Sequence, residues 1–87
     1  MRNILRLCQL GCMPHYYFDS RDGDDFVRDD VGLHFVNDEA ARNAATLGLA
    51  EFALEVLPGS ADRLLSIDVR DRDRHLFTAV IQFQISN

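Results

Sequence analysis

The fold is decided by residues 37–57, which read NDEAARNAATLGLAEFALEVL. This stretch predicts a helix. Asn37 is a residue type that caps helix N-termini, and two carboxylates follow it where they meet the free amides and the positive end of the helix dipole. A Pro-Gly step follows Leu57, and proline cannot continue a helix while glycine provides a C-terminal turn. We therefore expect one helix from Asn37 to about Leu57.

Small and apolar residues recur every three or four positions along this helix and form one stripe, which is typical of a helix that packs on a core. The stripe consists of Ala41, Ala45, Gly48, Leu49, Phe52 and Val56. Charged side chains flank it. We expect this face to lie on a β-sheet.

The segment before the helix predicts a β-hairpin. The aromatic run Tyr16–Asp19 has high strand propensity, and the Asp-Gly step at Asp22 is a turn signal. A second strand is expected near Phe26–Arg28. After an interruption it is expected to extend through Val31–Phe35, with a bulge or bend at Gly32.

The segment after the helix predicts a second hairpin. Apolar residues alternate with polar ones in Leu65–Arg70, and a longer strand is expected from Leu76 to Ile85. The predicted fold class is therefore α+β, with the order ββαββ. We expect a four-stranded, mainly antiparallel sheet with one helix packed on one face.

Composition limits the function. The chain has 87 residues, enough for one domain, and a net charge of −5 without a Lys/Arg stripe, which disfavours nucleic-acid binding. No stretch is long and apolar enough to be a membrane span, so a cytoplasmic location is expected. Cys8 and Cys12 both lie within the first twelve residues, so they cannot link the later elements in a disulfide framework, and nothing predicts a cofactor.

Several motifs resemble those of a family of short bacterial proteins that is known as a domain of unknown function. The resemblance lies in Met13–Asp19 (the pattern Met-Pro-basic-Tyr-Phe-Phe-Asp), Arg21–Asp24, Asp29–Gly32, Asp38–Arg42 and Ile67–Asp73. It implies the same fold and carries no activity. It also implies that Met13 is the true start, that residues 1–12 are a disordered tail, and that residues 13–87 are a single α+β domain. The layout is also similar to HicB-type antitoxins, which implies partner binding.

Crowded aspartates offer the oxygen ligands that hard cations prefer, and Asp22, Asp24 and Asp25 are the candidates here. Their spacing does not match a calcium-binding loop, and turn formation accounts for them, so no metal site is predicted. The enzymatic alternative is a small metal-assisted hydrolase or nuclease that uses Asp22 and Asp24 together with His15.

The more informative feature is an apolar row opposite the core stripe of the helix, formed by Leu47, Ala50, Leu54 and Leu57. A monomeric surface helix is normally polar there, although isolated exposed leucines are common. A second helix of the same kind would cover the row. The outer sheet face, expected to carry Tyr17, Leu76 and Val80, is a second candidate interface.

These observations lead to one main hypothesis and two alternatives. The main hypothesis is a non-enzymatic protein-interaction module that forms a homodimer, with a further protein partner possible. The alternatives are the metal-assisted hydrolase and an antitoxin-like regulator similar to HicB.

Overall fold

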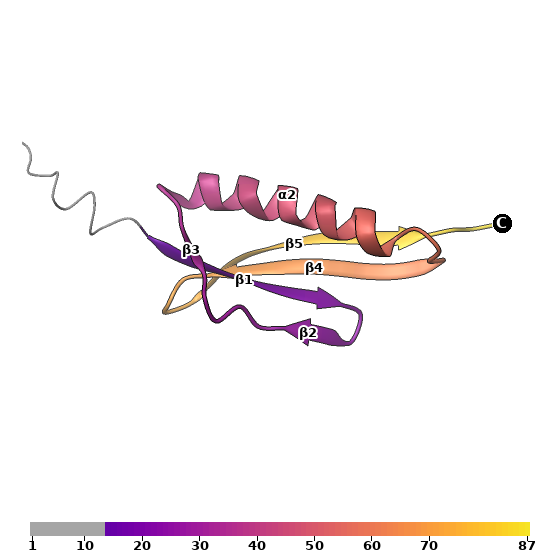
Figure 1. Ribbon diagram of the computed structural model, residues 1–87, viewed down its shortest axis with the longest axis horizontal. Helices are drawn as coiled ribbons and strands as arrows, with labels where there is room; N and C mark the ends of the chain where they lie inside the picture. Colours follow the sequence, from indigo (N-terminus) through magenta and orange to yellow (C-terminus); the bar gives the residue numbers. More distant parts are fainter. Residues whose placement is uncertain (1–13) are drawn as a thin grey trace, which may run out of the picture.

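A computed structural model describes residues 14–87, which form an α+β fold with one helix packed on an antiparallel sheet (Figure 1). The elements in chain order are β1 (His15–Asp22), β2 (Asp25–Val27), β3 (Leu33–His34), α2 (Asp38–Val56), β4 (Asp62–Arg70) and β5 (His75–Gln84). The predicted fold class and element order are confirmed. The sheet has five strands instead of four, because the predicted second strand is split into β2 and β3.

The main path of the sheet has the strand order β2-β1-β4-β5, and β3 pairs with the start of β1. Every pairing is antiparallel. Strand β4 is central, and its residues Leu65, Ile67 and Val69 are buried under the helix. Strand β5 is an edge strand of the sheet as far as residues 14–87 define it.

The first hairpin is tighter than the sequence predicted. Strand β1 continues to Asp22, which pairs with Asp25, so only Gly23 and Asp24 form the turn. Gly23 has φ 60°, a backbone conformation that suits the first position of a two-residue hairpin turn. The predicted strand ended at Asp19, but Ser20 and Arg21 are strand residues too, because a two-residue turn is sufficient.

The helix follows the prediction closely. The side chain of Asn37 accepts a hydrogen bond from the amide of Ala40 at 2.9 Å, and Leu57 is the C-terminal cap. Of the predicted stripe, Ala41, Ala45 and Leu49 are buried. Phe52 and Val56 pack against the same core.

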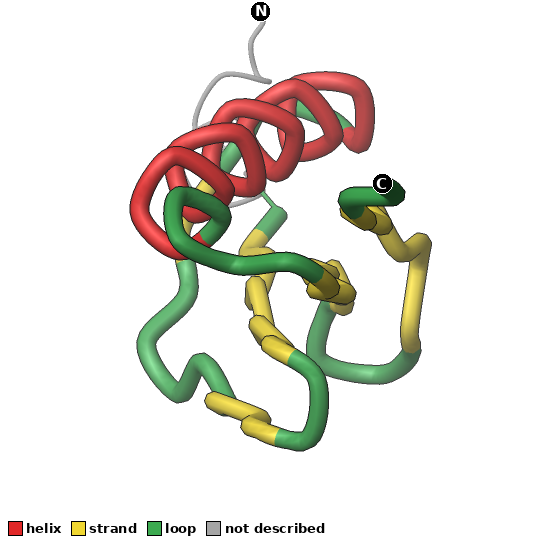
Figure 2. Tube along the Cα trace, turned by 90° about the vertical axis from the view of Figure 1, so that its right-hand side faces the viewer, coloured by secondary structure: helices red, strands yellow, loops and turns green. Residues whose placement is uncertain are grey.

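The helix crosses the sheet obliquely, as the end-on view in Figure 2 shows. Near its start it leans over the beginning of β5, where the guanidinium of Arg42 lies 5.7 Å from the ring centre of Phe77. Toward its end it lies away from the last residues of β5. A helix that crosses a twisted sheet in this way leaves part of the sheet uncovered on each side.

Tyr16 ties the start of the helix to the sheet. Its hydroxyl donates a hydrogen bond to Asp38 Oδ1 at 2.6 Å, and its ring is buried. Burial and the bond to this carboxylate together raise the pKa of Tyr16 to about 12. The contact fixes the first turn of α2 over the first residues of β1.

The expectations of a disordered tail over residues 1–12 and of a true start at Met13 lie outside the described residues. The single domain expected for residues 13–87 stays a prediction; the structure shows one continuous sheet and one core over residues 14–87. Within that range, α2 is not apolar enough to qualify as a transmembrane helix.

The loop between β2 and β3 depends on Gly32, which is buried with φ 74°. A Cβ at this position would lie 2.4 Å from His15 Nε2 and 2.7 Å from the Tyr16 carbonyl oxygen. We predict that Gly32→Ala lowers the free energy of unfolding by more than about 2 kcal/mol, because it adds a clash to the strain of a positive φ.

Gly23→Ala is the matched control, because Gly23 also has a positive φ but nothing lies within 4 Å of its added Cβ. Gly23→Ala should lower the free energy of unfolding only by the strain of a positive φ, about 1 kcal/mol. Chemical denaturation followed by circular dichroism measures both variants. Equal losses would contradict this account of the loop.

Candidate functional site

The apolar row on the outer side of α2 is exposed over most of its length. Leu47 is 67% exposed and Leu54 is 76% exposed, and Ala50 is exposed between them. Leu57 is half-buried and packs against the core. The row is therefore an accessible surface at its first three positions and part of the core at its last.

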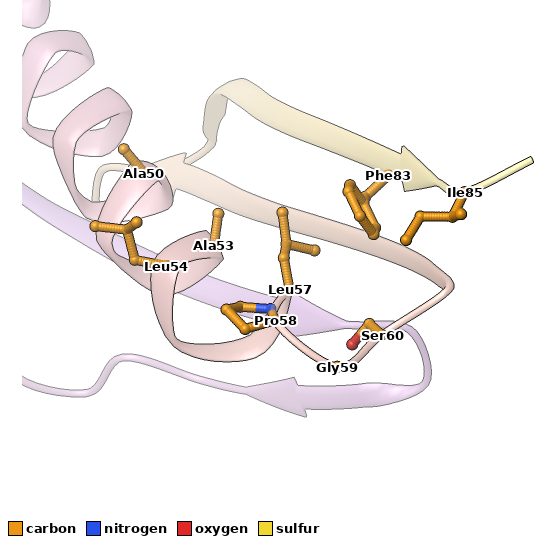
Figure 3. A pocket seen from close by; sticks show the side chains of 9 residues that line it. All are labelled: Ala50, Ala53, Leu54, Leu57, Pro58, Gly59, Ser60, Phe83 and Ile85. Carbon is orange, nitrogen blue, oxygen red and sulfur yellow. The ribbon is translucent and has the colours of Figure 1, made fainter.

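Three residues of this row also line a groove, which opens between the end of α2 and the end of β5 (Figure 3). The groove has a volume of about 390 Å³. Its lining residues are Ala50, Ala53, Leu54, Leu57, Pro58, Gly59, Ser60, Phe83 and Ile85. The sequence identified one wall of the groove, and the other wall, Phe83 and Ile85, comes from a strand distant in sequence.

The local chain path builds this groove. After Leu57 the Pro-Gly step turns the chain, Gly59 has φ 87°, and the Ser60 amide donates to the Leu57 carbonyl at 2.9 Å. The Ser60 hydroxyl donates to the Val56 carbonyl at 2.7 Å, so the one hydroxyl of the lining is already hydrogen-bonded. The surface offered to a ligand is therefore apolar.

Strand β5 borders the groove. It reads HLFTAVIQFQ and contains no Asp, Glu, Lys, Arg, Pro or Gly. Its residues Phe77, Ala79, Ile81 and Phe83 face the helix and are only half-buried. Edge strands are normally protected from pairing by charges, proline, bulges or short length, and the regular part of β5 has none of these.

The second candidate interface, on the outer sheet face, is not assembled as predicted. Val80 is 56% exposed there, but the Tyr17 ring is covered by the guanidinium of Arg70 at 4.5 Å. Leu76 packs against the core instead of joining them. The reason is a register shift beside Val69, which interrupts the alternation that the sequence pattern assumes.

The hydrolase alternative needs His15 near the hairpin carboxylates. His15 and Asp22 occupy opposite ends of β1, about 23 Å apart at ~3.3 Å per residue. Asp22 pairs with Arg63 at 2.6 Å, whereas Asp24 and Asp25 are exposed. Residues 14–87 contain no cluster of three ligands suited to a metal ion. The structure does not bring this proposed site together.

Another possible acid–base group lies where β5 begins. His75 Nε2 is 2.8 Å from Thr78 Oγ1, and that hydroxyl donates to Asp68 Oδ1 at 2.5 Å. Because the hydroxyl proton is directed at the carboxylate, the imidazole is the donor to Thr78 and not its base. This arrangement is the reverse of an activated nucleophile.

Two further aspartates of the aspartate-rich stretch, Asp19 and Asp29, organise the other side of the molecule. The Asp29 carboxylate accepts hydrogen bonds from the amides of Phe18, Val31 and Gly32, each at 3.0 Å. The Asp29 amide in turn donates to Asp19 Oδ1 at 2.8 Å. The bonds to Phe18 and Asp19 attach the segment between β2 and β3 to strand β1, and the other two hold the segment in its turn.

Asp19 is almost fully buried, and Arg70 compensates its charge. Arg70 Nε donates to Asp19 Oδ2 at 2.8 Å, and Arg70 Nη2 donates to the Asp29 carbonyl at 2.9 Å. Burial alone would raise the pKa of both carboxyls, but their hydrogen bonds outweigh it, so the pKa of Asp19 and that of Asp29 are lowered. These bonds stabilise this side of the fold, and the sequence pattern did not predict Arg70 as the partner of Asp19.

The family model described as "Domain of unknown function (DUF6894)" matches residues 15–84. No curated protein and no solved structure matches the chain. The resemblance to HicB-type antitoxins stays a prediction.

We predict that Asp29→Asn lowers the free energy of unfolding at neutral pH by about 1–3 kcal/mol, because an amide oxygen replaces only one of two accepting carboxylate oxygens. The folded-state pKa of Asp29 is lowered, so its contribution is complete above the ordinary value of about 3.9 and is lost as pH falls through the folded value. The difference between wild type and variant should therefore shrink below about pH 4.

Asp24→Asn is the control, because this carboxylate is exposed on the turn. Urea denaturation from neutral pH down to acid gives the comparison. A constant difference for Asp29→Asn over the whole range would rule out ionised Asp29 as the source of this stability.

Proposed function

Because the chain belongs to the DUF6894 family, a domain of unknown function, its role has to be inferred from its geometry, and we propose that it is a non-enzymatic protein-interaction module that forms a homodimer through the apolar groove. The observation that carries the proposal is the continuity of two uncharged surfaces. One is the groove, and the other is the unprotected edge strand beside it.

The lining favours a protein over a small molecule. Sites for small molecules combine an apolar wall with a few polar groups that orient the ligand. The Ser60 hydroxyl is bonded to the helix, and the remaining lining residues have no polar side chain. Such a groove has nothing to orient a metabolite, but it suits the apolar side chains of a polypeptide.

The distribution of charge supports the same proposal. Glu51 and Glu55 are on the flank of α2 away from the groove, as the helical repeat of about 3.6 residues requires. A chain with a net charge of −5 is repelled by its own copies at long range. The groove and β5 together form a zone where two copies can meet without a carboxylate between them.

Exposed apolar side chains also border the groove. Leu54 and Ile85 are 76% and 56% exposed on opposite sides of the groove, and Leu47 continues the surface along the helix. Contiguous apolar patches on a small protein mark interaction sites more often than scattered residues do. Burial of these side chains would stabilise a dimer.

We predict that Leu54→Asp raises the dissociation constant of the homodimer by about 100-fold, equivalent to about 2.7 kcal/mol, because a carboxylate would be buried in an apolar contact. Sedimentation velocity over a range of protein concentrations measures the change.

Val36→Asp is the matched control, because Val36 is 68% exposed and precedes the helix at its other end. It should leave association unchanged, and circular dichroism checks that both variants fold. A wild-type protein that stays monomeric at high concentration and is indifferent to Leu54→Asp would refute the proposed homodimer.

A further inference from the structure

Building on the proposed homodimer, we infer that the second copy binds as a β-strand: two β5 strands pair antiparallel about a two-fold axis at Ile81 and join the two sheets into one. The partner of the edge strand is thus a second copy of this chain. The groove beside β5 is closed by the same event.

The backbone groups for this pairing are defined by the ladder between β4 and β5. The Ile85 amide donates to the Ala61 carbonyl at 2.9 Å, and the register continues from there to Phe77. In an antiparallel ladder, alternate residues direct their N–H and C=O groups to opposite sides. The outward residues are therefore Thr78, Val80, Gln82 and Gln84, and no strand within residues 14–87 pairs with them.

Symmetry restricts the possible registers. A two-fold axis that relates antiparallel neighbours is perpendicular to the sheet, so each side chain keeps its face. Residues that are directly opposite each other must share a face of the sheet. The axis, which lies midway between the two strands, is therefore level with one residue of each strand, and that residue is opposite its own copy. Both helices then lie on the same side of the joined sheet.

The axis at Ile81 is favoured by the regular part of the strand. The bulge beside Val69 disturbs β5 before Phe77, so the regular segment is Phe77 to Ile85, and Ile81 is its centre. The resulting pairs on the helix side are Phe77 with Ile85, Ala79 with Phe83, and Ile81 with itself. Every member of these pairs is apolar, and aromatic and β-branched residues are favourable cross-strand partners.

The same register uses the whole free edge. Thr78 meets Gln84 and Val80 meets Gln82, so each outward residue exchanges two hydrogen bonds. An axis at Val80 would instead set Gln84 against the bulged Leu76 and leave Ile85 against His75. It would satisfy fewer backbone groups and bury less apolar surface.

The oblique helix makes the two copies complementary. Each helix leans over β5 near Phe77 and leaves the groove open near Phe83 and Ile85. The two-fold axis sets Phe77 of one copy opposite Ile85 of the other. The end of β5 that is covered by the helix in each copy therefore lies opposite the open end of β5 in its partner. The two-fold symmetry repeats this contact on both sides of the axis.

Charge does not oppose this arrangement. Strand β5 carries no Asp, Glu, Lys or Arg, so no like charges become cross-strand neighbours within it. The two helices run in opposite directions, which is the favourable arrangement of their dipoles. Glu51 and Glu55 stay on the outer flanks.

Cysteine cross-linking in a Cys8→Ser, Cys12→Ser background tests the register. Ile81→Cys should oxidise to a disulfide-linked dimer about tenfold faster than Val80→Cys, because only opposed residues bring their Cβ atoms within the ~4 Å of a disulfide. Faster cross-linking of Val80→Cys would overturn the axis at Ile81.

Because Ile81 is half-buried, a second test uses exposed positions only. A mixture of Val80→Cys and Gln82→Cys proteins should cross-link faster than either protein alone, since these residues are opposed between copies. Association that persists and remains sensitive to Leu54→Asp, without either cross-link, would overturn strand pairing and leave the proposed homodimer standing. A monomer whose outward β5 amides are nevertheless protected from hydrogen exchange would assign that edge to residues 1–13. It would overturn both the strand pairing and the proposed homodimer.

Discussion

The structure depends on one geometric constraint, which is that a single straight helix has to cover a wider, twisted sheet. A helix with its side chains is about 10 Å across, whereas four strands about 4.8 Å apart span more than 14 Å between their outer axes. Helix α2 therefore buries the central strand β4 and crosses the sheet obliquely. Two opposite regions of the sheet face are left for other parts of the molecule, or for another molecule, to cover.

These two regions of the sheet differ in how they are covered. On the β1 side, the segment between β2 and β3 is attached to β1 through Asp29, which accepts from the Phe18 amide and donates its own amide to Asp19. Leu33 of β3 lines an apolar hollow beside the helix there. The edge there is short and bordered by charged residues, as protected edges usually are. On the β5 side, the uncharged edge and the groove have no such cover within residues 14–87. This asymmetry is the physical basis of the proposed homodimer.

Sequence reasoning succeeded where the signal is local. The cap at Asn37, the Pro-Gly stop and the core stripe of α2 depend on neighbours a few residues apart, and the structure confirms them. It failed where strands meet. The bulge beside Val69 that turns Leu76 into the core, and the bond between Asp19 and Arg70, depend on register across the sheet, which an alternating pattern does not encode. Only one wall of the groove was predicted, for the same reason. The helical wall follows from the periodic apolar row, whereas the second wall depends on strand order.

The most direct test of this account is amide hydrogen exchange along β5 at high and low protein concentration. The account predicts that the outward amides of Thr78, Val80, Gln82 and Gln84 exchange slowly at high concentration and become fast on dilution, while the inward amide of Ile81 stays protected by β4. Outward amides that exchange fast at every concentration, beside a stable ladder between β4 and β5, would contradict it.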